Sequence, residues 1–470
     1  MFRSVMLRGD EPDRDPSNIM QGCQVYVKSA DDSLTLETDE SYELSISKAP
    51  YIQLKANTVF GALRGLETLS QLIEPGARTI GTYEISDKPR FHYRGSLIDT
   101  SRHCYPLNVI FQHIDAMAYA KLNVLHWHIV DDQSFPYQSK TFPEMSRAGA
   151  FTPRHVYSIE DVKAVINYAY NRGIRVIPEF DTPGHVTKGW NALNPPVLTD
   201  CYDASGKKIG TGPLNPTINR TYEVVAQLYA EIKSVFKDKF VHVGGDEVIQ
   251  DCWLSNPQIR EWMKSHPEVK TGADLQSYYI QRLLEILKQQ GSSYIVWQEI
   301  FDDGNKLLPD TVVEVWKEEN WKDVMAAVTK AGFHSVLSAP FYLNYISYGL
   351  DWVKYYKTEP SDFEGGAEAE KSGLLSGLEV CMWSEFVDAT NFIPRSWPRT
   401  AAVAERAWSD KSVTDVDSAQ ARIQEFRCKL LERGINAEPI ADGWEMGPPL
   451  NGYTYCENEW NPRYSPGWFN

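Results

Sequence analysis

Two adjacent acidic residues, Asp246 and Glu247, are the strongest candidates for chemistry in this sequence. They follow a short β-branched and aromatic segment, residues 240–243, and a pair of glycines, so they stand where a buried strand is expected to meet its loop. An apolar lining and the charge of Asp246 would both disfavour ionised Glu247, and a carboxylic acid kept protonated near neutral pH can act as a general acid. A glycine turn before a helix would also accommodate two acids, because the helix dipole favours negative charge at its N-terminus. The segment alone leaves both interpretations open.

Length and charge limit the kinds of protein this chain can be. A chain of 470 residues suits a barrel-sized domain plus a smaller one. Its 47 Lys and Arg against 63 Asp and Glu give a formal net charge of -16, which argues against a nucleic-acid partner and for a neutral or uncharged polymer. The apolar runs are too short for a membrane span and the N-terminus has no apolar signal core. We therefore expect either a cytosolic protein or one whose leader is absent from this sequence.

Residues 1–87 are predicted to form a small α+β domain. Segments 24–28 and 42–46 alternate like half-exposed strands, and apolar residues recur at helical spacing over 58–73. A linker is expected at Asp87-Lys-Pro, because the pattern beyond it changes to strand, loop and helix in repetition.

Residues 88–470 are predicted to form a (β/α)8 TIM barrel of the α/β class with a C-terminal extension. The expected strands are 93–99, 123–130, 174–180, 240–243, 293–299, 311–316, 334–339 and 378–385. The expected helices are 107–122, 159–171, 222–236, 275–288 and 321–330. Eight strands separated mostly by helices are typical of a parallel barrel with right-handed crossovers.

Acids and aromatic residues gather at the predicted C-terminal strand ends, which form the active site of such a barrel. These residues are Asp99, Asp131, Asp181, Asp246, Glu247, Trp297, Trp316, Tyr342, Trp383 and Glu385. Their number favours chemistry over a simple helix start for the acid pair. Carboxylates with aromatic walls and no cluster of metal ligands point to glycoside hydrolysis, in which one acid protonates the leaving oxygen.

The spacing of Asp246 and Glu247 bears on which group acts as the nucleophile. A nucleophile and an acid that flank one sugar stand about 5 Å apart in retaining glycosidases. Successive side chains on a strand point to opposite faces, so the neighbours Asp246 and Glu247 are poorly placed for that task. We therefore expect the substrate to supply the nucleophile.

Six motifs occur in one order along the chain. They are Asp-Thr-Ser-Arg-His (99–103), His-Trp-His-Ile-Val-Asp-Asp (126–132), Glu-Phe-Asp-Thr-Pro-Gly-His (179–185), His-Val-Gly-Gly-Asp-Glu-Val (242–248), Val-Trp-Gln-Glu (296–299) and Tyr-Leu-Asn (342–344). With them the chain resembles the β-N-acetylhexosaminidases of glycoside hydrolase family 20, most closely the animal lysosomal type. The resemblance covers nearly the whole chain, from residue 59 to Cys428. It implies an exo-acting enzyme without cofactor or metal that removes terminal N-acetylglucosamine or N-acetylgalactosamine from glycoconjugates or chitooligosaccharides.

The resemblance also implies substrate-assisted retention, in which the 2-acetamido carbonyl attacks its own anomeric carbon. Glu247 would be the acid and then the base for water. Asp246 would orient the acetamide N–H, and Tyr342 would hold its oxygen. The other predicted substrate-binding residues are Arg102, Asp131, His185, Trp297, Trp316, Asn344, Trp383 and Glu385. Among them the three tryptophans would wall the acetamide pocket, and Arg102 and Glu385 would grip ring hydroxyls.

Simpler roles and other functions stay open. Arg102 could be a structural ion-pair partner, the tryptophans could be barrel core, and His185 could be a hydrogen-bonded brace. The same fold could carry a catalytically silent sugar-binding or cell-recognition protein, although a pure binder needs no proton donor. A metal-dependent barrel hydrolase would need histidines that converge with the acids.

Cysteines and a sequon bear on the compartment. The resemblance implies the disulfides Cys201 with Cys252 and Cys428 with Cys456, hence an oxidising compartment, lysosomal or extracellular. Asn219 begins an Asn-x-Thr sequon and would be glycosylated there.

The remaining cysteines and the oligomeric state are also expectations from the resemblance. Cys23 matches a position whose partner lies before residue 1, so we expect a missing N-terminal segment, while Cys104 and Cys381 are expected to be buried thiols. Family members of this type generally dimerise, which implies a homodimer. The pair Asn344-Tyr345 matches neither of the family patterns that set tolerance of sulfated or sialylated substrates, so that preference stays open.

Overall fold

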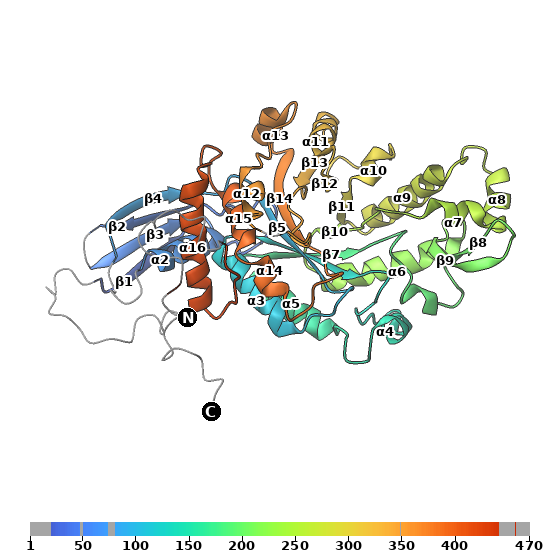
Figure 1. Ribbon diagram of the computed structural model, residues 1–470, viewed down its shortest axis with the longest axis horizontal. Helices are drawn as coiled ribbons and strands as arrows, with labels where there is room; N and C mark the ends of the chain where they lie inside the picture. Colours follow the sequence, from blue (N-terminus) through green and yellow to red (C-terminus); the bar gives the residue numbers. More distant parts are fainter. Residues whose placement is uncertain (1–19, 48–49, 74–79, 348, 441–455, 457–470) are drawn as a thin grey trace. The chain divides into compact units, whose positions relative to one another are not determined.

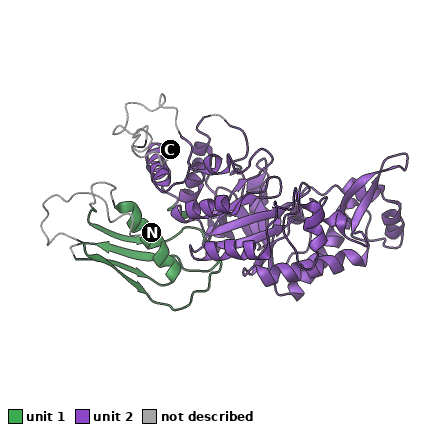
Figure 2. Ribbon diagram, turned by 90° about the horizontal axis from the view of Figure 1, so that it is seen from below, with its two compact units in different colours: residues 1–92, 408–410 green, residues 93–407, 411–470 purple. Residues whose placement is uncertain are grey.

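The computed structural model of the chain describes two compact units. The described residues are 20–47, 50–73, 80–347, 349–440 and 456. One unit comprises residues 1–92 with 408–410, and the other comprises residues 93–407 with 411–470 (Figure 2).

The first unit is a four-stranded sheet with one long helix. The sheet has the order β1-β3-β2-β4, formed by β1 (Gly22–Val27), β2 (Tyr42–Ile46), β3 (Tyr51–Ala56) and β4 (Tyr83–Asp87). Strands β1 and β3 are parallel, and β2 pairs antiparallel with β3 and β4. Helix α2 (Val59–Leu72) begins where the Thr58 side chain accepts from the backbone N–H of Gly61, and its Leu69 packs with Leu44 and Leu54. The predicted small α+β domain is confirmed, although the sequence did not indicate β3 and β4.

The second unit is a closed parallel barrel, as predicted. Its order is β10-β11-β12-β13-β14-β5-β6-β7. The strands are β5 (Tyr93–Asp99), β6 (Val124–Val130), β7 (Arg175–Phe180), β10 (Phe240–His242), β11 (Ser293–Trp297), β12 (Val312–Val315), β13 (His334–Leu337) and β14 (Leu375–Met382). The pairing of β14 with β5 closes the barrel from Gly377 opposite Tyr93 to Met382 opposite Ile98.

Amphipathic helices cover the outside of the barrel (Figure 1). The long ones are α3 (Leu107–Tyr119), α5 (Ile159–Tyr170), α6 (Asn219–Val235), α9 (Gly272–Gln289), α11 (Trp321–Lys330), α15 (Arg399–Trp408) and α16 (Val416–Glu432). Shorter helices of the described chain are α4 (Pro143–Gly149), α7 (Gln250–Ser255), α8 (Pro257–Lys264), α10 (Glu299–Asp302), α12 (Trp352–Lys357), α13 (Gly366–Ser372) and α14 (Phe392–Ser396). Capping boxes at Ser158 and Thr271 start α5 and α9 by satisfying free backbone N–H groups. Among the described helices, none has the length and apolar character needed to cross a bilayer.

A hairpin that the sequence did not indicate is inserted between β7 and α6. It consists of β8 (Leu198–Tyr202) and β9 (Lys208–Leu214), and the disulfide between Cys201 and Cys252 ties β8 to α7. A second disulfide joins Cys428 on α16 to Cys456. Both expected disulfides are therefore present.

The other three cysteines are free thiols. Cys381 is buried as expected, whereas Cys104 and Cys23 are half-buried. Cys104 is less buried than predicted because it lies in the loop after β5, where its thiol faces the Tyr157 hydroxyl at 3.5 Å. Residues 441–455 and 457–470, most of the expected C-terminal extension, lie outside the described residues.

Candidate active site

A pocket opens at the C-terminal ends of the barrel strands. Each of the eight strands contributes to it, either with its last residues or with the loop that follows. It is lined by Arg102, His128, Asp131, Asp181, His185, Asp246, Glu247, Trp297, Trp316, Tyr342, Asn344, Tyr345, Trp383 and Glu385. All eleven catalytic and substrate-binding residues predicted from the sequence are in this set. The structure thus brings together residues that are up to 283 positions apart along the chain, from Arg102 to Glu385.

The acid pair is placed by a tight glycine turn after β10. Gly244 and Gly245 have φ of 68° and 99°, a backbone conformation that other residues adopt only with strain. The N–H of Gly245 donates to Asp181 Oδ1 over 2.9 Å. A Cβ on Gly244 would stand 1.7 Å from the same oxygen, so only glycine fits against Asp181. This close approach fixes the glycine turn, and the residue after the turn, Asp246, lines the pocket.

Two sequence-based expectations about the pair are wrong. β10 ends at His242, so Asp246 and Glu247 lie in the loop, the alternation of strand faces does not apply, and both line the same pocket. Glu247 is also not enclosed by an apolar lining, because its side chain is 61% exposed whereas that of Asp246 is 13% exposed. The expectation of a nucleophile from the substrate therefore rests on the family resemblance and not on strand geometry.

His185 stands between the acid pair and Asp131. Its Nδ1 lies 3.1 Å from Asp131 Oδ1, while its Nε2 lies 3.7 Å from Asp246 Oδ2 and 3.8 Å from Glu247 Oε2. Burial lowers the pKa of His185, but the charge of Asp181, the bond to Asp131 and the charge of Asp246 together raise it to about 12. His185 is therefore an imidazolium that faces the acid pair.

Arg102 is a cation of the pocket and is held by neighbouring acids. Its guanidinium lies 3.0 Å from Asp99 Oδ2, 2.8 Å from Asp131 Oδ2 and 3.9 Å from Glu385 Oε1. Burial lowers the pKa of Arg102, and the charges of Asp99 and Asp131 more than offset this and raise it. The guanidinium also lies 5.1 Å from the ring centre of Trp383. Arg102 is thus both an ion-pair partner and a lining residue.

Aromatic rings form one wall of the pocket. The ring centres of Trp297 and Trp383 are 6.1 Å apart, those of Trp316 and Tyr342 are 6.1 Å apart, and Tyr345 stacks on Tyr342 at 5.8 Å. Burial raises the pKa of Tyr342 well above its ordinary value, so its hydroxyl stays protonated and can donate. The tryptophans are therefore pocket wall as well as the edge of the barrel core.

Three lining residues were given no catalytic or substrate-binding role from the sequence: His128, Asp181 and Tyr345. His128 stands two positions after His126 on β6, so period-two alternation points both into the barrel. Asp181 stands at the end of β7 and burial, with the charge of Asp246, raises its pKa well above the ordinary value. The strand-end position had already placed Asp181 at the mouth of the barrel, whereas the only signal for Tyr345 was its place beside Asn344.

Histidine and acidic atoms come close together at two places in the pocket. In each of the groups Asp131-Asp132-His185 and Asp181-His185-Asp246, one atom per residue lies within 4.8 Å of the others. The oxygens of Asp131 already accept from His128, His185 and Arg102, and Asp181 Oδ1 accepts from the N–H of Gly245. Protein donors thus occupy the oxygens of Asp131 and one oxygen of Asp181, and a metal-free site stays a prediction.

Acids, an arginine and a wall of tryptophans and tyrosines at the C-terminal mouth of a parallel barrel define a barrel glycosidase. Residues 91–411 match the family described as "Glycosyl hydrolase family 20, catalytic domain", and residues 6–72 match "beta-acetyl hexosaminidase like". The chain belongs to glycosyl hydrolase family 20.

Relatives and solved structures agree with this assignment. The chain is 52% identical over 412 residues to human beta-hexosaminidase subunit beta, which covers 87% of this chain and 73% of that protein. It is 48% identical over 427 residues to bovine beta-hexosaminidase subunit alpha, covering 89% and 80%. The crystal structure of a Flavobacterium johnsoniae chitobiase aligns with a TM-score of 0.76 at 33% identity, over 86% of this chain and 61% of that one. The predicted family and the prediction of a glycoside hydrolase are confirmed, and both weigh against the silent sugar-binding alternative.

Proposed function

We propose that this chain is an exo-acting β-N-acetylhexosaminidase that removes terminal N-acetylglucosamine or N-acetylgalactosamine from glycoconjugates or chitooligosaccharides. The observation that carries the proposal is one pocket in which Asp246 and Glu247 face a wall of Trp297, Trp316 and Trp383. Acids supply the proton chemistry of glycoside hydrolysis, and flat aromatic walls suit the acetamide group and the apolar face of a sugar. Relatives named beta-hexosaminidase support the same substrate class.

The first step is proposed to be substrate-assisted. The acetamide carbonyl oxygen bonds to the anomeric carbon while the bond to the leaving oxygen breaks and Glu247 gives that oxygen its proton. Asp246 accepts a hydrogen bond from the acetamide N–H and stabilises the positive charge that develops on the cyclised group. The protonated hydroxyl of Tyr342 donates to the acetamide oxygen and holds it beneath the anomeric carbon.

In the second step water replaces the acetamide oxygen. Glu247 takes a proton from water, the water oxygen bonds to the anomeric carbon, and the cyclised group reopens with overall retention. Glu247 is well exposed at the pocket edge, which suits a group that must meet both a leaving sugar and an incoming water. The imidazolium of His185, 3.8 Å away, stabilises the carboxylate form of Glu247 between the two steps.

Sugar hydroxyls are proposed to bind at the floor of the pocket. Arg102, fixed by Asp99 and Asp131, points further donors towards the sugar, and Glu385 lies 3.9 Å from it as an acceptor. Among the described residues, none donates a hydrogen bond to the buried side-chain oxygen of Asn344, which a substrate donor would satisfy.

Four further features belong to the proposal. Two disulfides support a lysosomal or secreted enzyme. Asn219, exposed at the start of α6, is proposed to carry a glycan.

We propose a homodimer, since the relatives are named as subunits. Residues 88–470 are proposed to form the catalytic domain and residues 1–87 a separate small domain.

A pair of fluorogenic glycosides, with and without the 2-acetamido group, tests this function. If the substrate supplies the nucleophile, only the acetamido sugar should be turned over, and a thiazoline mimic of the cyclised group should inhibit far more tightly than the free sugar binds. Comparable turnover of both glycosides, or a covalent bond between a sugar and a carboxylate of the enzyme, would show an ordinary two-carboxylate mechanism.

A further inference from the structure

The barrel interior beneath the pocket is filled with ionisable side chains. Barrels of this kind are normally packed there with branched apolar residues. Here the inward-facing residues include six that are at most 1% exposed: His126, His128, Glu179, His242, Glu314 and Glu379. Buried charges are tolerated only when they are paired and hydrogen-bonded, so their pairing determines what they do.

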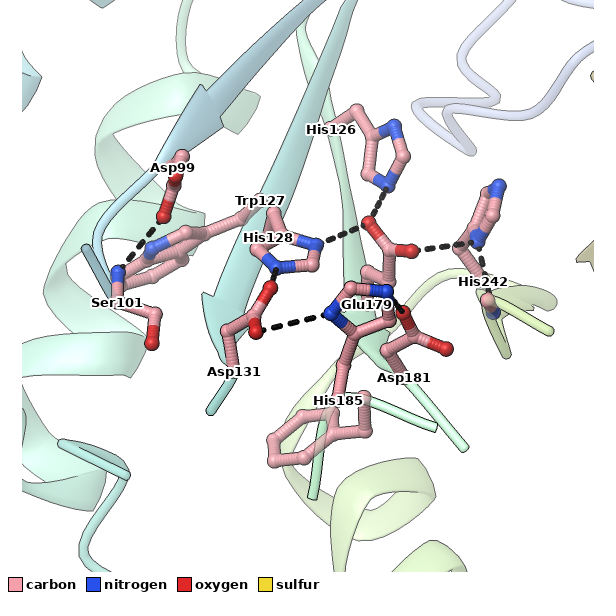
Figure 3. A network of polar contacts seen from close by, with 12 residues as sticks. Asp99, Ser101, His126, Trp127, His128, Asp131, Glu179, Asp181, His185 and His242 are labelled. Carbon is pink, nitrogen blue, oxygen red and sulfur yellow. Dashed lines mark hydrogen bonds and ion pairs between the residues drawn. The ribbon is translucent and has the colours of Figure 1, made fainter. Parts of the chain in front are cut away.

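The carboxylates and imidazoles of this interior form an alternating chain that leads to the pocket. His126 joins Glu379 to Glu179, with an Nδ1–Oε1 distance of 2.6 Å and an Nε2–Oε2 distance of 3.0 Å. His128 joins Glu179 to Asp131, with an Nδ1–Oε2 distance of 2.6 Å and an Nε2–Oδ2 distance of 2.8 Å. Figure 3 shows the part of this chain from His126 through Glu179 and Asp131 to His185 at the pocket.

His128 is an imidazolium between two carboxylates. Both of its nitrogens face carboxylate oxygens, which only accept, so both nitrogens must carry protons. Burial lowers the pKa of His128, but the charge of Glu179 and the bond to Asp131 raise it to about 9. In turn, burial raises the pKa of Glu179, and the charges of His128 and His242 outweigh this and hold it well below the ordinary value. Glu179 is therefore a carboxylate.

The alternating chain of carboxylates and imidazoles branches at Glu179, and the second branch leads to the aromatic wall. Its Oε1 accepts from the indole N–H of Trp297 over 2.8 Å, while its Oε2 accepts from His128. Trp297 packs against Trp383 in the pocket wall. The other branch continues from His128 through Asp131 to His185, which faces the acid pair. The two oxygens of one buried carboxylate thus hold both sides of the pocket.

We propose that Glu179 is a positioning residue that couples the aromatic wall to the acid pair. It does not line the pocket, so its effect must pass through Trp297 on one side and His128 on the other. The inference rests on the proposed function, in which the wall holds the acetamide while Glu247 protonates the leaving oxygen. A fixed distance between wall and acid is then a condition for catalysis.

Glu179→Gln tests this role, because it keeps the shape of the side chain but turns one acceptor into an N–H donor. Either Trp297 or His128 then faces a donor instead of an acceptor. We expect kcat to fall by about 10- to 100-fold, the size of effect that misplaced catalytic groups produce. The loss should be larger on an unactivated disaccharide than on an activated phenyl glycoside, and thiazoline inhibition should weaken in parallel.

Glu314→Gln is the matched control. Glu314 is equally buried in the same interior, accepts from Ser338 and lies 3.5 Å from His242 Nε2, and its hydrogen bonds within the described residues include neither Trp297 nor His128. We expect it to lower thermal stability with a change in kcat below about threefold. Equal losses of kcat in both variants, without a change in leaving-group dependence, would reduce Glu179 to a structural residue and overturn the proposal.

A double-mutant cycle decides the question if Glu179→Gln does not fold. Trp297→Phe removes the indole donor and His128→Gln removes the link to Asp131. Coupling through Glu179 predicts that the loss of kcat/KM in the double variant is at least about threefold smaller than the product of the two single losses. Multiplicative losses would overturn the coupling. If the wild-type enzyme turns over the glycoside that lacks the acetamido group, the proposed mechanism is wrong. The double-mutant cycle could then still be measured on that substrate.

Discussion

His185 Nε2 lies 3.8 Å from Glu247 Oε2, and His185 Nδ1 lies 3.1 Å from Asp131 Oδ1. This arrangement gives an exposed acid a fixed positive neighbour, where the sequence had indicated an apolar enclosure. A nearby cation favours the ionised form of a carboxyl group, whereas an apolar enclosure would favour the protonated form. In the proposed mechanism, His185 would stabilise the carboxylate that Glu247 becomes after it donates its proton.

Glu247→Gln should abolish turnover of substrates with poor leaving groups and spare activated phenyl glycosides more. The amide cannot protonate a leaving oxygen, and an activated phenolate needs little protonation. Loss of a general acid typically costs about 10²- to 10⁴-fold. Steady-state kcat/KM on a disaccharide and on an activated glycoside measures the difference, and equal losses on both would contradict the acid role.

Asp246→Asn should lower kcat by about 10²- to 10³-fold and change KM little. The proposed task of Asp246 is to stabilise charge that appears only after the acetamide attacks, and such interactions act on the transition state more than on the bound substrate. Full kinetics with an acetamido glycoside separate the two constants. An effect confined to KM would assign Asp246 to ground-state binding.

Stability should fall as the pH rises from about 6.5 to about 9. The pKa of His128 is raised from 6.5 to about 9 in the fold, so its proton stabilises the folded state fully below the lower value and is lost through the higher one. The shift corresponds to on the order of 3 kcal/mol. Thermal midpoints across this range test the sign, and His128→Gln should flatten the slope. An unchanged slope in that variant would point to another group.

Activity should persist in excess chelator. The oxygens of Asp131 are occupied by His128, His185 and Arg102, and the proposed chemistry needs only proton transfers and the acetamide. The measurement is kcat after dialysis against a strong chelator, with a mock dialysis as control. A loss that is reversed by adding back a divalent metal would favour the metal-dependent alternative.

The sequence located the barrel strands well but not all of their ends. Strand β14 was predicted over 378–385 and spans Leu375–Met382, and β11 was predicted over 293–299 and ends at Trp297. In β14 the apolar pattern continues past the last paired residue, because Trp383 in the pocket wall resembles one more strand residue. Hairpin β8–β9 was missed for the opposite reason, since the first four residues of β9, from Lys208, are exposed and carry no buried pattern.

Site residues were predictable from their position at strand ends, whereas their partners were not. Asp246, Glu247 and Trp297 could be placed because each follows or ends a strand. The exposure of Glu247 depends on the backbone of the glycine turn, and Glu247 itself has a φ of 49° that no local pattern specifies. The bond between His128 and Glu179 depends on the pairing of β6 with β7, which places these two residues opposite one another.

The glycine turn that carries the acid pair gives the sharpest structural prediction. Gly244 and Gly206 have similar φ of 68° and 82°, so alanine at either should cost about 1–2 kcal/mol from the left-handed backbone. A Cβ at Gly206 meets nothing within 4 Å, whereas at Gly244 it would stand 1.7 Å from Asp181 Oδ1.

Gly206→Ala should therefore lower the thermal midpoint slightly and leave kcat unchanged. Gly244→Ala should lower the midpoint further and reduce kcat at least about 10²-fold, because Asp181 or the turn must move and carry Asp246 with it. Unfolding curves and kcat of the two variants, measured side by side, separate backbone strain from the clash. Equal kcat in both variants would mean that the contact between Gly244 and Asp181 does not set the position of the acid pair.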